Sequence, residues 1–183
     1  MNIAVLAGGL SPERNVSLSS GSLIAAALRR KGHKVLLLDV YFGIDLPSTT
    51  DPLSLFTSEQ QNEDFSVDTK VPDIEKLKEQ KGDNELIGKN VLKLCEVADT
   101  VFLALHGSMG ENGQLQATLD NFGISTYSGS GYVGSLLAMD KDISKRLLAA
   151  AGVSTPPWIY SKTKDIRSFV LTSVRIICLV NVR

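Results

Sequence analysis

The strongest constraint on the fold lies at the N-terminus, where a short apolar run ends in two glycines and precedes a helical pattern. Residues 2–7 are almost wholly apolar, which is typical of a buried parallel strand that leaves its sheet through a tight turn. Residues 16–31 carry apolar side chains at helical spacing and end in three basic residues before a glycine. A second apolar run covers residues 34–41. Strand, helix and strand with short connections form a βαβ unit, which predicts an α/β fold built on a parallel sheet.

A polar interruption separates this unit from further strand and helix patterns. Residues from about 43 to 82 are polar, irregular and interrupted by prolines, which predicts an exposed and partly mobile insertion. An apolar stripe at 87–97 then predicts a helix, and an apolar run at 100–105 predicts a third strand. Further helices are predicted at residues 112–121, 131–139 and 140–151, with a short fourth strand at 124–127. Residues 168–183 contain an apolar run, but one strand without partners cannot make a second domain.

Charge and cysteine content narrow the class of protein. The chain has 19 lysines and arginines against 20 aspartates and glutamates, so its formal charge is −1. Such a balance offers no basic surface for nucleic acid or an anionic membrane. Cys95 and Cys178 lie far apart, and neither has a metal-binding spacing, as expected of cytosolic thiols. No cleavable signal or membrane-spanning run of about 20 apolar residues is recognisable. We therefore expect a cytoplasmic protein with neither nucleic acid nor membrane as a partner.

Two loops that follow strand patterns are the places where a ligand is expected. In an open α/β sheet, ligands bind beyond the carboxyl ends of the strands, where loops and helix N-termini converge. The first loop covers residues 8–14 and the second covers residues 106–113. The first lacks the GxGxxG spacing of a dinucleotide site, and Glu13 would bring negative charge to the place of a phosphate. Asp39 could contact a ribose, but a solvent-facing aspartate is the simpler interpretation. A dinucleotide-binding domain is the least favoured hypothesis.

Glu13 and His106 are the side chains in these loops that suit a small zwitterion. Glu13 could hold the ammonium of an amino acid, or it could merely complement the dipole of the helix that follows Ser11 and Pro12. His106 ends an apolar strand, and its imidazole could bind a carboxylate or could tie down its own loop. The residues alone leave both alternatives open.

The remaining titratable residues give weaker signals. His33 lies on a helix-to-strand turn among lysines and is expected at the surface. Lys141 and Lys145 stand four apart, so both ammonium groups can point to one side of a helix. One of them could contact a nucleotide phosphate, although such a pair is usually a solvated face.

Several sequence blocks, taken together, resemble the D-alanine:D-alanine ligases, amino-acid ligases of the ATP-grasp superfamily that make the terminal dipeptide of bacterial peptidoglycan. The blocks occur in the family's order and cover most of residues 2–158. They comprise residues 5–9 with 11–18, 102–107 with 110–116, 127–131, 138–141 with Lys145, and 152–156. No single block is decisive, but the ordered combination is highly specific.

The resemblance implies a Rossmann-like parallel sheet with flanking helices, followed by the first helix of an ATP-grasp domain. It also implies roles for individual residues. The glutamate matching Glu13 acts on the amino group of the first D-alanine, and the histidine matching His106 contacts its carboxylate. Val16 and Ser17 would shape the same pocket, and Lys141 would contact ATP. In the family reaction, ATP phosphorylates one D-alanine and the amine of a second displaces phosphate, with magnesium ions neutralising the phosphates.

The resemblance fades after Trp158. Residues 1–130 are expected to form the N-terminal substrate domain, residues 131–160 the start of the central ATP-grasp domain, and residues 161–183 a tail unlike the family. Our leading hypothesis is a truncated D-alanine:D-alanine ligase that lacks activity alone and binds neither ATP nor magnesium tightly. The alternative is a non-catalytic amino-acid-binding or dimerisation module, in keeping with a possible homodimer.

Overall fold

The computed structural model describes residues 1–60, 71–161 and 178–181. The chain divides into two compact units, Met1–Ser135 and Leu136–Arg183. Within the described part of the chain, no helix has the length and apolar character needed to cross a bilayer.

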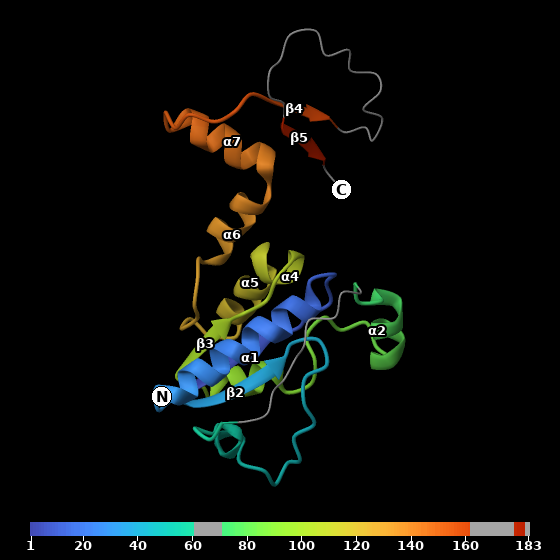
Figure 1. Cartoon of the computed structure of the whole chain (residues 1–183), viewed down its shortest axis with the longest axis vertical. Coiled ribbons are helices and arrows are strands. Elements are labelled where there is room, and N and C mark those ends of the chain that lie inside the picture. Colours follow the sequence, from blue (N-terminus) through green and yellow to red (C-terminus); the bar gives the residue numbers. More distant parts are fainter. Residues whose placement is uncertain (61–70, 162–177, 182–183) are drawn as a thin grey trace. The chain divides into compact units, whose positions relative to one another are not determined.

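The N-terminal unit is built on a three-stranded parallel sheet (Figure 1). Its strands are β1 (Asn2–Ala7), β2 (Lys34–Asp39) and β3 (Thr100–Leu103), in the spatial order β2-β1-β3. The register places Ala4 of β1 opposite Leu36 on one side and Val101 on the other. Strand β1 lies in the centre and is buried from Ile3 to Ala7, which explains why its sequence is a continuous apolar run. The α/β class predicted from the βαβ pattern is confirmed.

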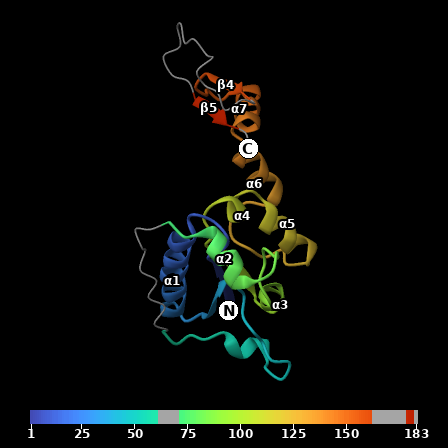
Figure 2. The same cartoon turned by 90° about the vertical axis from the view of Figure 1, so that its right-hand side faces the viewer.

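Helix α1 (Arg14–Arg30) covers one face of the sheet, and α3 (Val91–Glu96) lies on the other face with α5 (Gln114–Asn121) (Figure 2). Alternate residues of β1 pack on the two faces of the sheet. Val5 packs with Ala25 of α1, whereas Leu6 belongs to the core formed with Leu94 and Leu119. Helix α1 approaches β1 closely because Gly21 has no side chain, and a Cβ added there would lie 2.6 Å from the Ala7 Cβ.

The ends of α1 and β2 differ slightly from the predicted bounds. Helix α1 begins two residues before the predicted start, because residues 11–13 form a turn in which the Arg14 amide donates to the Ser11 carbonyl. Strand β2 ends at Asp39 rather than at residue 41, because the Asp39 carboxylate accepts hydrogen bonds from the backbone amides of Tyr41 and Phe42 and turns the chain there.

The segment between β2 and α3 contains two short helices that the sequence did not predict. The first is the 3₁₀ helix η1 (Pro52–Leu55), and the second is α2 (Ile74–Lys81). Asp73 caps the N-terminus of α2, and Gly82 ends it in the left-handed conformation. The polar composition masked these signals. Residues 61–70 of the predicted insertion lie outside the described residues.

The region after β3 also departs from the prediction. Helix α4 (Ser108–Glu111) was not predicted. The fourth strand expected at residues 124–127 is wrong as a regular strand, because only a single parallel bridge joins Tyr127 to Val101. Backbone hydrogen bonds connect Val101 to Thr126 and Ser128, but Ser125 and Thr126 are exposed. Because few apolar side chains would be buried here, a longer ladder of hydrogen bonds would add little stability to the sheet.

Helix α6 (Tyr132–Met139) crosses the boundary between the units, and α7 (Lys141–Ala150) lies wholly in the second. Both match the predicted helices, 131–139 and 140–151, within one residue at every end. Asp140 caps α7 by accepting hydrogen bonds from the amides of Asp142 and Ile143. Strand β4 (Trp158–Ser161) then pairs in parallel with β5 (Cys178–Asn181), so the late apolar run has the partner that the sequence did not predict. Residues 162–177 and 182–183 of the predicted tail lie outside the described residues.

Candidate functional site

The candidate site lies at the carboxyl edge of the sheet, where the loops after β1 and β3 meet. Gly8 and Gly9 follow β1 with φ of 76° and 80°, and Gly107 follows β3 with φ of 87°. These left-handed conformations are strained for residues with side chains, so glycine allows both loops to turn sharply beside each other. The Ala104 amide donates to the Leu6 carbonyl and continues the ladder up to this turn.

Glu13 occupies the N-cap position of α1 and its side chain is exposed. The carboxylate reaches across to the second loop, since a Cβ added to Gly107 would lie 2.6 Å from Glu13 Oε2. Ser11 links the two loops. Its hydroxyl donates to the His106 carbonyl at 2.9 Å and accepts from the Glu13 amide at 3.2 Å. The Glu13 carboxylate therefore lies against the residue that directly follows His106.

His106 is half-buried, and its ring lies near α1. The ring Nε2 is 3.4 Å from the hydroxyl of Ser20, which lies about two helical turns beyond Glu13 on the same helix. Glu13 and His106, predicted from separate loops, thus lie on the same edge of the sheet, and neither is buried among apolar neighbours.

Ser17 and Val16 occupy different environments in the first turn of α1. Ser17 is fully buried, and its hydroxyl donates to the Ala104 carbonyl at 2.8 Å and accepts from the Gly8 amide at 2.9 Å. Ser17 therefore joins the helix to the first loop and to the residue that follows β3. Val16 is 44% exposed and presents an apolar side chain beside Glu13.

An ion pair beneath the first loop was missed by the sequence analysis. The Arg14 guanidinium donates to both carboxylate oxygens of Asp39 and also to the Gly9 carbonyl, at 3.1 Å. It lies 5.0 Å from the centre of the Phe42 ring. Both interpretations of Asp39, as a ribose ligand and as a solvent-facing residue, are wrong, because its carboxylate is occupied by Arg14 and by two backbone amides. An arginine after the Glu13 position and an acid at the end of β2 were the available signals.

The two lysines of α7 belong to the second unit and differ from each other. Lys141 is exposed at the first residue of the helix. The Lys145 ammonium donates to Thr155 Oγ1 at 2.9 Å and to the Pro156 carbonyl at 3.1 Å, and it lies 5.5 Å from the Trp158 ring centre. Lys145 therefore holds the loop that leads into β4 and does not share a solvated face with Lys141.

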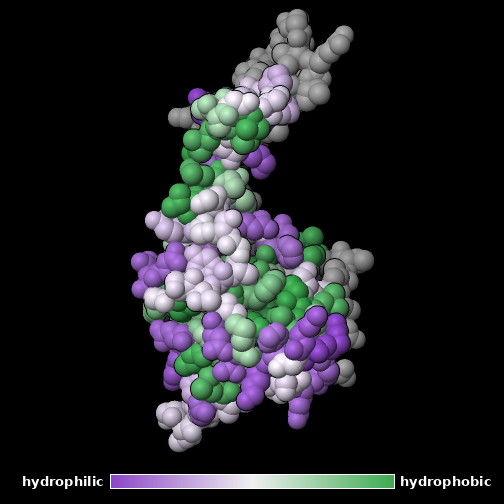
Figure 3. All heavy atoms as spheres, turned by 90° about the vertical axis from the view of Figure 1, so that its left-hand side faces the viewer, coloured by the Kyte–Doolittle hydropathy of each residue, from purple (hydrophilic) through white to green (hydrophobic). Residues whose placement is uncertain are grey.

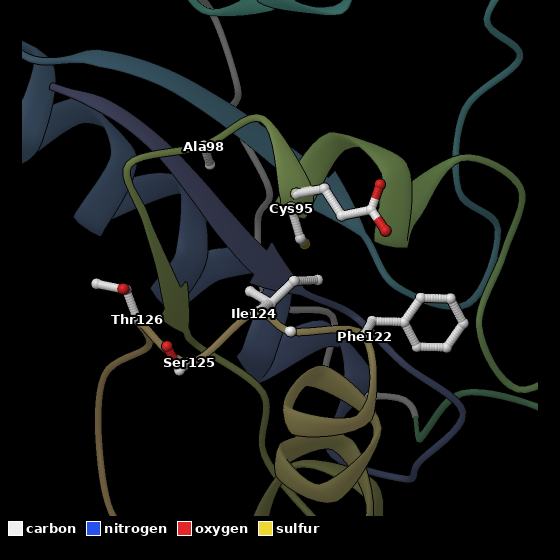
Figure 4. Close-up of a pocket in the computed structure, with 8 residues that line it drawn as sticks. Cys95, Ala98, Phe122, Ile124, Ser125 and Thr126 are labelled. Atoms are coloured by element: carbon white, nitrogen blue, oxygen red, sulfur yellow. The ribbon is translucent and has the colours of Figure 1, made fainter.

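A hollow of about 210 Å³ lies at the opposite edge of the same sheet, before β3 begins (Figure 4). It is lined by residues 95, 96, 98 and 122–126. Burial raises the pKa of the Cys95 thiol to about 12, with a smaller contribution from the charge of Glu96. A thiol with such a pKa stays protonated at neutral pH and is a poor nucleophile. Cys95 is therefore not a candidate for a catalytic nucleophile.

A second hollow, of about 260 Å³, lies beside the first turn of α1. Arg14 and Asn15 line it from α1, and Pro72, Lys76 and Leu77 line it from α2 and the residues before it. Within residues 1–60, 71–161 and 178–181, no cluster of three or more histidine, cysteine, aspartate or glutamate side chains is placed to hold a metal ion.

Comparison with known proteins gives one consistent match. Residues 2–130 match the family model described as D-ala D-ala ligase N-terminus. The D-alanine–D-alanine ligase of Pediococcus pentosaceus is 44% identical over 167 residues, which are 90% of this chain and 47% of the relative. The ligase of Lacticaseibacillus casei is 42% identical over 158 residues, 85% of this chain and 43% of the relative. The chain thus spans less than half the length of these curated relatives.

Solved structures agree with this match. The crystal structure of D-alanine–D-alanine ligase from Bacillus anthracis complexed with ATP has a TM-score of 0.56 at 27% sequence identity. The match covers 87% of this chain and 37% of that chain. A second structure of the ligase from the same organism gives a TM-score of 0.55 at 28% identity.

Proposed function

Because the chain belongs to the D-alanine–D-alanine ligase family, of which it carries the N-terminal part, we propose that its sheet edge binds the first D-alanine. Glu13 receives the ammonium group, and His106 receives the carboxylate. The observation that carries this proposal is the contact of the two loops, which brings the Glu13 carboxylate against Gly107, next to His106. A carboxylate and an imidazole on facing loops match the two charged ends of a small zwitterion.

The other two residues of the first helical turn complete the pocket. Val16 provides an exposed apolar surface for the methyl group of the ligand. Ser17 shapes the pocket indirectly, since both of its hydrogen bonds go to the backbone of the strands and loops. In this proposal Glu13 and His106 bind the charged groups of the ligand, and Val16 and Ser17 determine the shape of the pocket.

The ligation itself belongs to the full-length family enzyme in this proposal. There, ATP phosphorylates the carboxylate of one D-alanine, and the amine of the second displaces phosphate to form D-alanyl-D-alanine for peptidoglycan. Lys141 contacts ATP. Magnesium supplies charge neutralisation at the phosphates when bound. The described residues contain no fitting metal site, so we assign no magnesium ligand to them.

We further propose that the polypeptide of these 183 residues does not catalyse the ligation by itself, because one exposed lysine cannot position a triphosphate. In this proposal residues 1–130 form the substrate domain and residues 131–160 begin the ATP-grasp domain, whereas residues 161–183 serve no family role. The cytoplasm, where ATP is available, is the proposed location. Assay of D-alanine-dependent ADP release tests the first statement, and clear turnover by the isolated chain would refute it.

One observation favours the alternative of a non-catalytic module that associates with a copy of itself. Apolar side chains are exposed along α6 and α7 of the second unit (Figure 3). They are Leu136, Met139, Ile143, Leu147 and Leu148, with exposed fractions between 41% and 56%. Contiguous apolar surface of this kind marks interaction sites. Size-exclusion chromatography with light scattering distinguishes a monomer from a homodimer.

Calorimetric titration with D-alanine tests the binding proposal. Glu13→Gln and His106→Gln are each expected to weaken D-alanine binding at least tenfold, since each removes one charged or hydrogen-bonding partner of the zwitterion. Glu96→Gln, at the opposite edge of the sheet, and His33→Gln, on the turn between α1 and β2, make the same chemical changes away from the pocket and are the matched controls. Equal effects of the site variants and their controls, or an unchanged affinity in both site variants, would refute the proposal.

A further inference from the structure

We infer that Arg14 and Asp39 form a positioning pair that holds the Glu13 carboxylate in place and keeps it available to a ligand. This inference rests on the proposed function in one respect, namely that the ligand of Glu13 is a small ammonium compound. Arg14 and Asp39 themselves do not touch the ligand. They act on the loop that carries Glu13.

The contacts of Arg14 anchor the loop at both of its ends. Its backbone amide donates to the Ser11 carbonyl at 3.1 Å, within the turn that precedes α1. Its guanidinium folds back beneath the loop and donates to the Gly9 carbonyl at 3.1 Å. Arg14 thus contacts the loop near its start, at Gly9, and closes the turn at its end. Glu13 lies within that turn, between Ser11 and Arg14.

The space beneath the loop is filled by the ion pair itself. A Cβ added to Gly8 would lie 2.8 Å from an Asp39 carboxylate oxygen and 3.0 Å from Arg14 Nη1. The loop therefore passes directly over the pair. Asp39 is fixed in turn, because its Oδ1 accepts hydrogen bonds from the amides of Tyr41 and Phe42 at 2.9 and 3.3 Å. The pair is a rigid support rather than a flexible surface bridge.

Asp39 also neutralises the positive charge of Arg14. The Arg14 side chain is only 9% exposed, so its cation needs a partner within the protein. Asp39 provides that partner. Without Asp39, the nearest competing anion on the same loop is the carboxylate of the adjacent residue, Glu13. A guanidinium that turned to Glu13 would occupy the place of the ligand's ammonium group.

Lysine cannot replace arginine in this arrangement. The planar guanidinium contacts Asp39 with two nitrogens while also donating to the Gly9 carbonyl. A lysine ammonium keeps the charge but lacks the fork that holds both partners at once. Arg14→Lys therefore keeps the positive charge and removes the forked contact geometry. Asp39→Asn keeps the shape of the side chain and removes its negative charge.

Amide hydrogen exchange, measured by NMR on the full 183-residue chain, tests the positioning role without any ligand. In Arg14→Lys and Asp39→Asn, we expect at least tenfold faster exchange at the Gly8 and Glu13 amides, with the amides of β1 changed less than twofold. Unchanged exchange at both loop amides would overturn the inference. A uniform acceleration that includes β1 would also overturn it, because it would show a general loss of stability.

Titration with D-alanine tests the consequence for the ligand. Both variants are expected to bind at least tenfold more weakly than the unaltered chain, whereas Arg30→Lys and Asp45→Asn, at exposed positions, bind as the unaltered chain does. Wild-type affinity in both Arg14→Lys and Asp39→Asn would overturn the inference. Should the unaltered chain bind no D-alanine, the proposed ligand fails, and the exchange rates alone decide whether the pair positions the loop.

Discussion

Replacement of Gly107 by alanine should push the Glu13 carboxylate away from its place against residue 107. The structure gives two separate reasons. The new Cβ would lie 2.6 Å from Glu13 Oε2, closer than real Cβ contacts, and 3.0 Å from both the Cβ and the Oγ of Ser11. In addition, φ at this position is 87°, a conformation that L-residues adopt at a cost. The backbone cost acts on stability, whereas the steric contact acts on the site.

The backbone cost is about 1–2 kcal/mol for a residue with a Cβ in the left-handed region. Gly32 isolates this cost, because its φ is 84° and a Cβ added there meets no atom within 4 Å. Gly32→Ala therefore imposes the same strain without the contact to Glu13 and Ser11. We expect Gly107→Ala to lower the free energy of unfolding by about 1–3 kcal/mol, at least as much as Gly32→Ala does.

The two variants should differ clearly in D-alanine binding measured by titration calorimetry. Gly107→Ala is expected to weaken D-alanine binding at least tenfold, since the carboxylate is displaced from its place against residue 107, whereas Gly32→Ala leaves the affinity unchanged. Urea denaturation followed by circular dichroism gives the stability of both. Equal D-alanine affinity in the two variants would refute the claim that Glu13 has to lie against residue 107.

Three further predictions concern other parts of the chain. Ser17→Ala leaves the Gly8 amide and the Ala104 carbonyl without a buried partner, and we expect a loss of about 1–3 kcal/mol in urea denaturation, with half-buried Ser19→Ala as the milder control. Hydrogen bonds from Arg146 and Trp158 hold the pKa of Asp142 below its usual value of 3.8. A lowered folded-state pKa stabilises the second unit above about pH 4, and this contribution is lost as the pH falls through the lowered pKa. Fluorescence of Trp158, the only tryptophan, should therefore change in acid in the unaltered chain, and Asp142→Asn should abolish that transition; an identical acid transition in both would contradict it. In a Cys178→Ser background, the raised pKa and burial of Cys95 predict negligible reaction with a thiol reagent at pH 8 until denaturant is added, and rapid native reaction would show that the thiol is accessible.

The central part of the fold was predictable because its sequence pattern and its burial have the same cause. Strand β1 is apolar throughout since both of its faces are covered, and α1 ends where Gly32 follows the basic residues. The weaker elements failed for an equally physical reason. Helix α2 has no buried residue, so no apolar stripe marked it, and the expected strand at 124–127 has exposed side chains on much of its length.

The site was predictable only in part. Glu13 and His106 follow strands, and the carboxyl ends of parallel strands share an edge, so topology alone brings their loops together. The pairing of Arg14 with Asp39 was not predictable in this way, because it depends on a side chain folding back under its own loop. Pairing of β4 with β5 joins segments separated by residues 162–177, and no local pattern specifies such a partner.

Mapping of the binding surface by NMR tests the central claim most directly. D-Alanine added to the ¹⁵N-labelled chain should shift the amide signals of Gly9, Glu13, His106 and Gly107, while those around Cys95 and Ile124, at the other edge of the sheet, stay in place. Shifts confined to that other edge, or none at millimolar D-alanine, would contradict the assignment of the Glu13 and His106 loops as the amino-acid site.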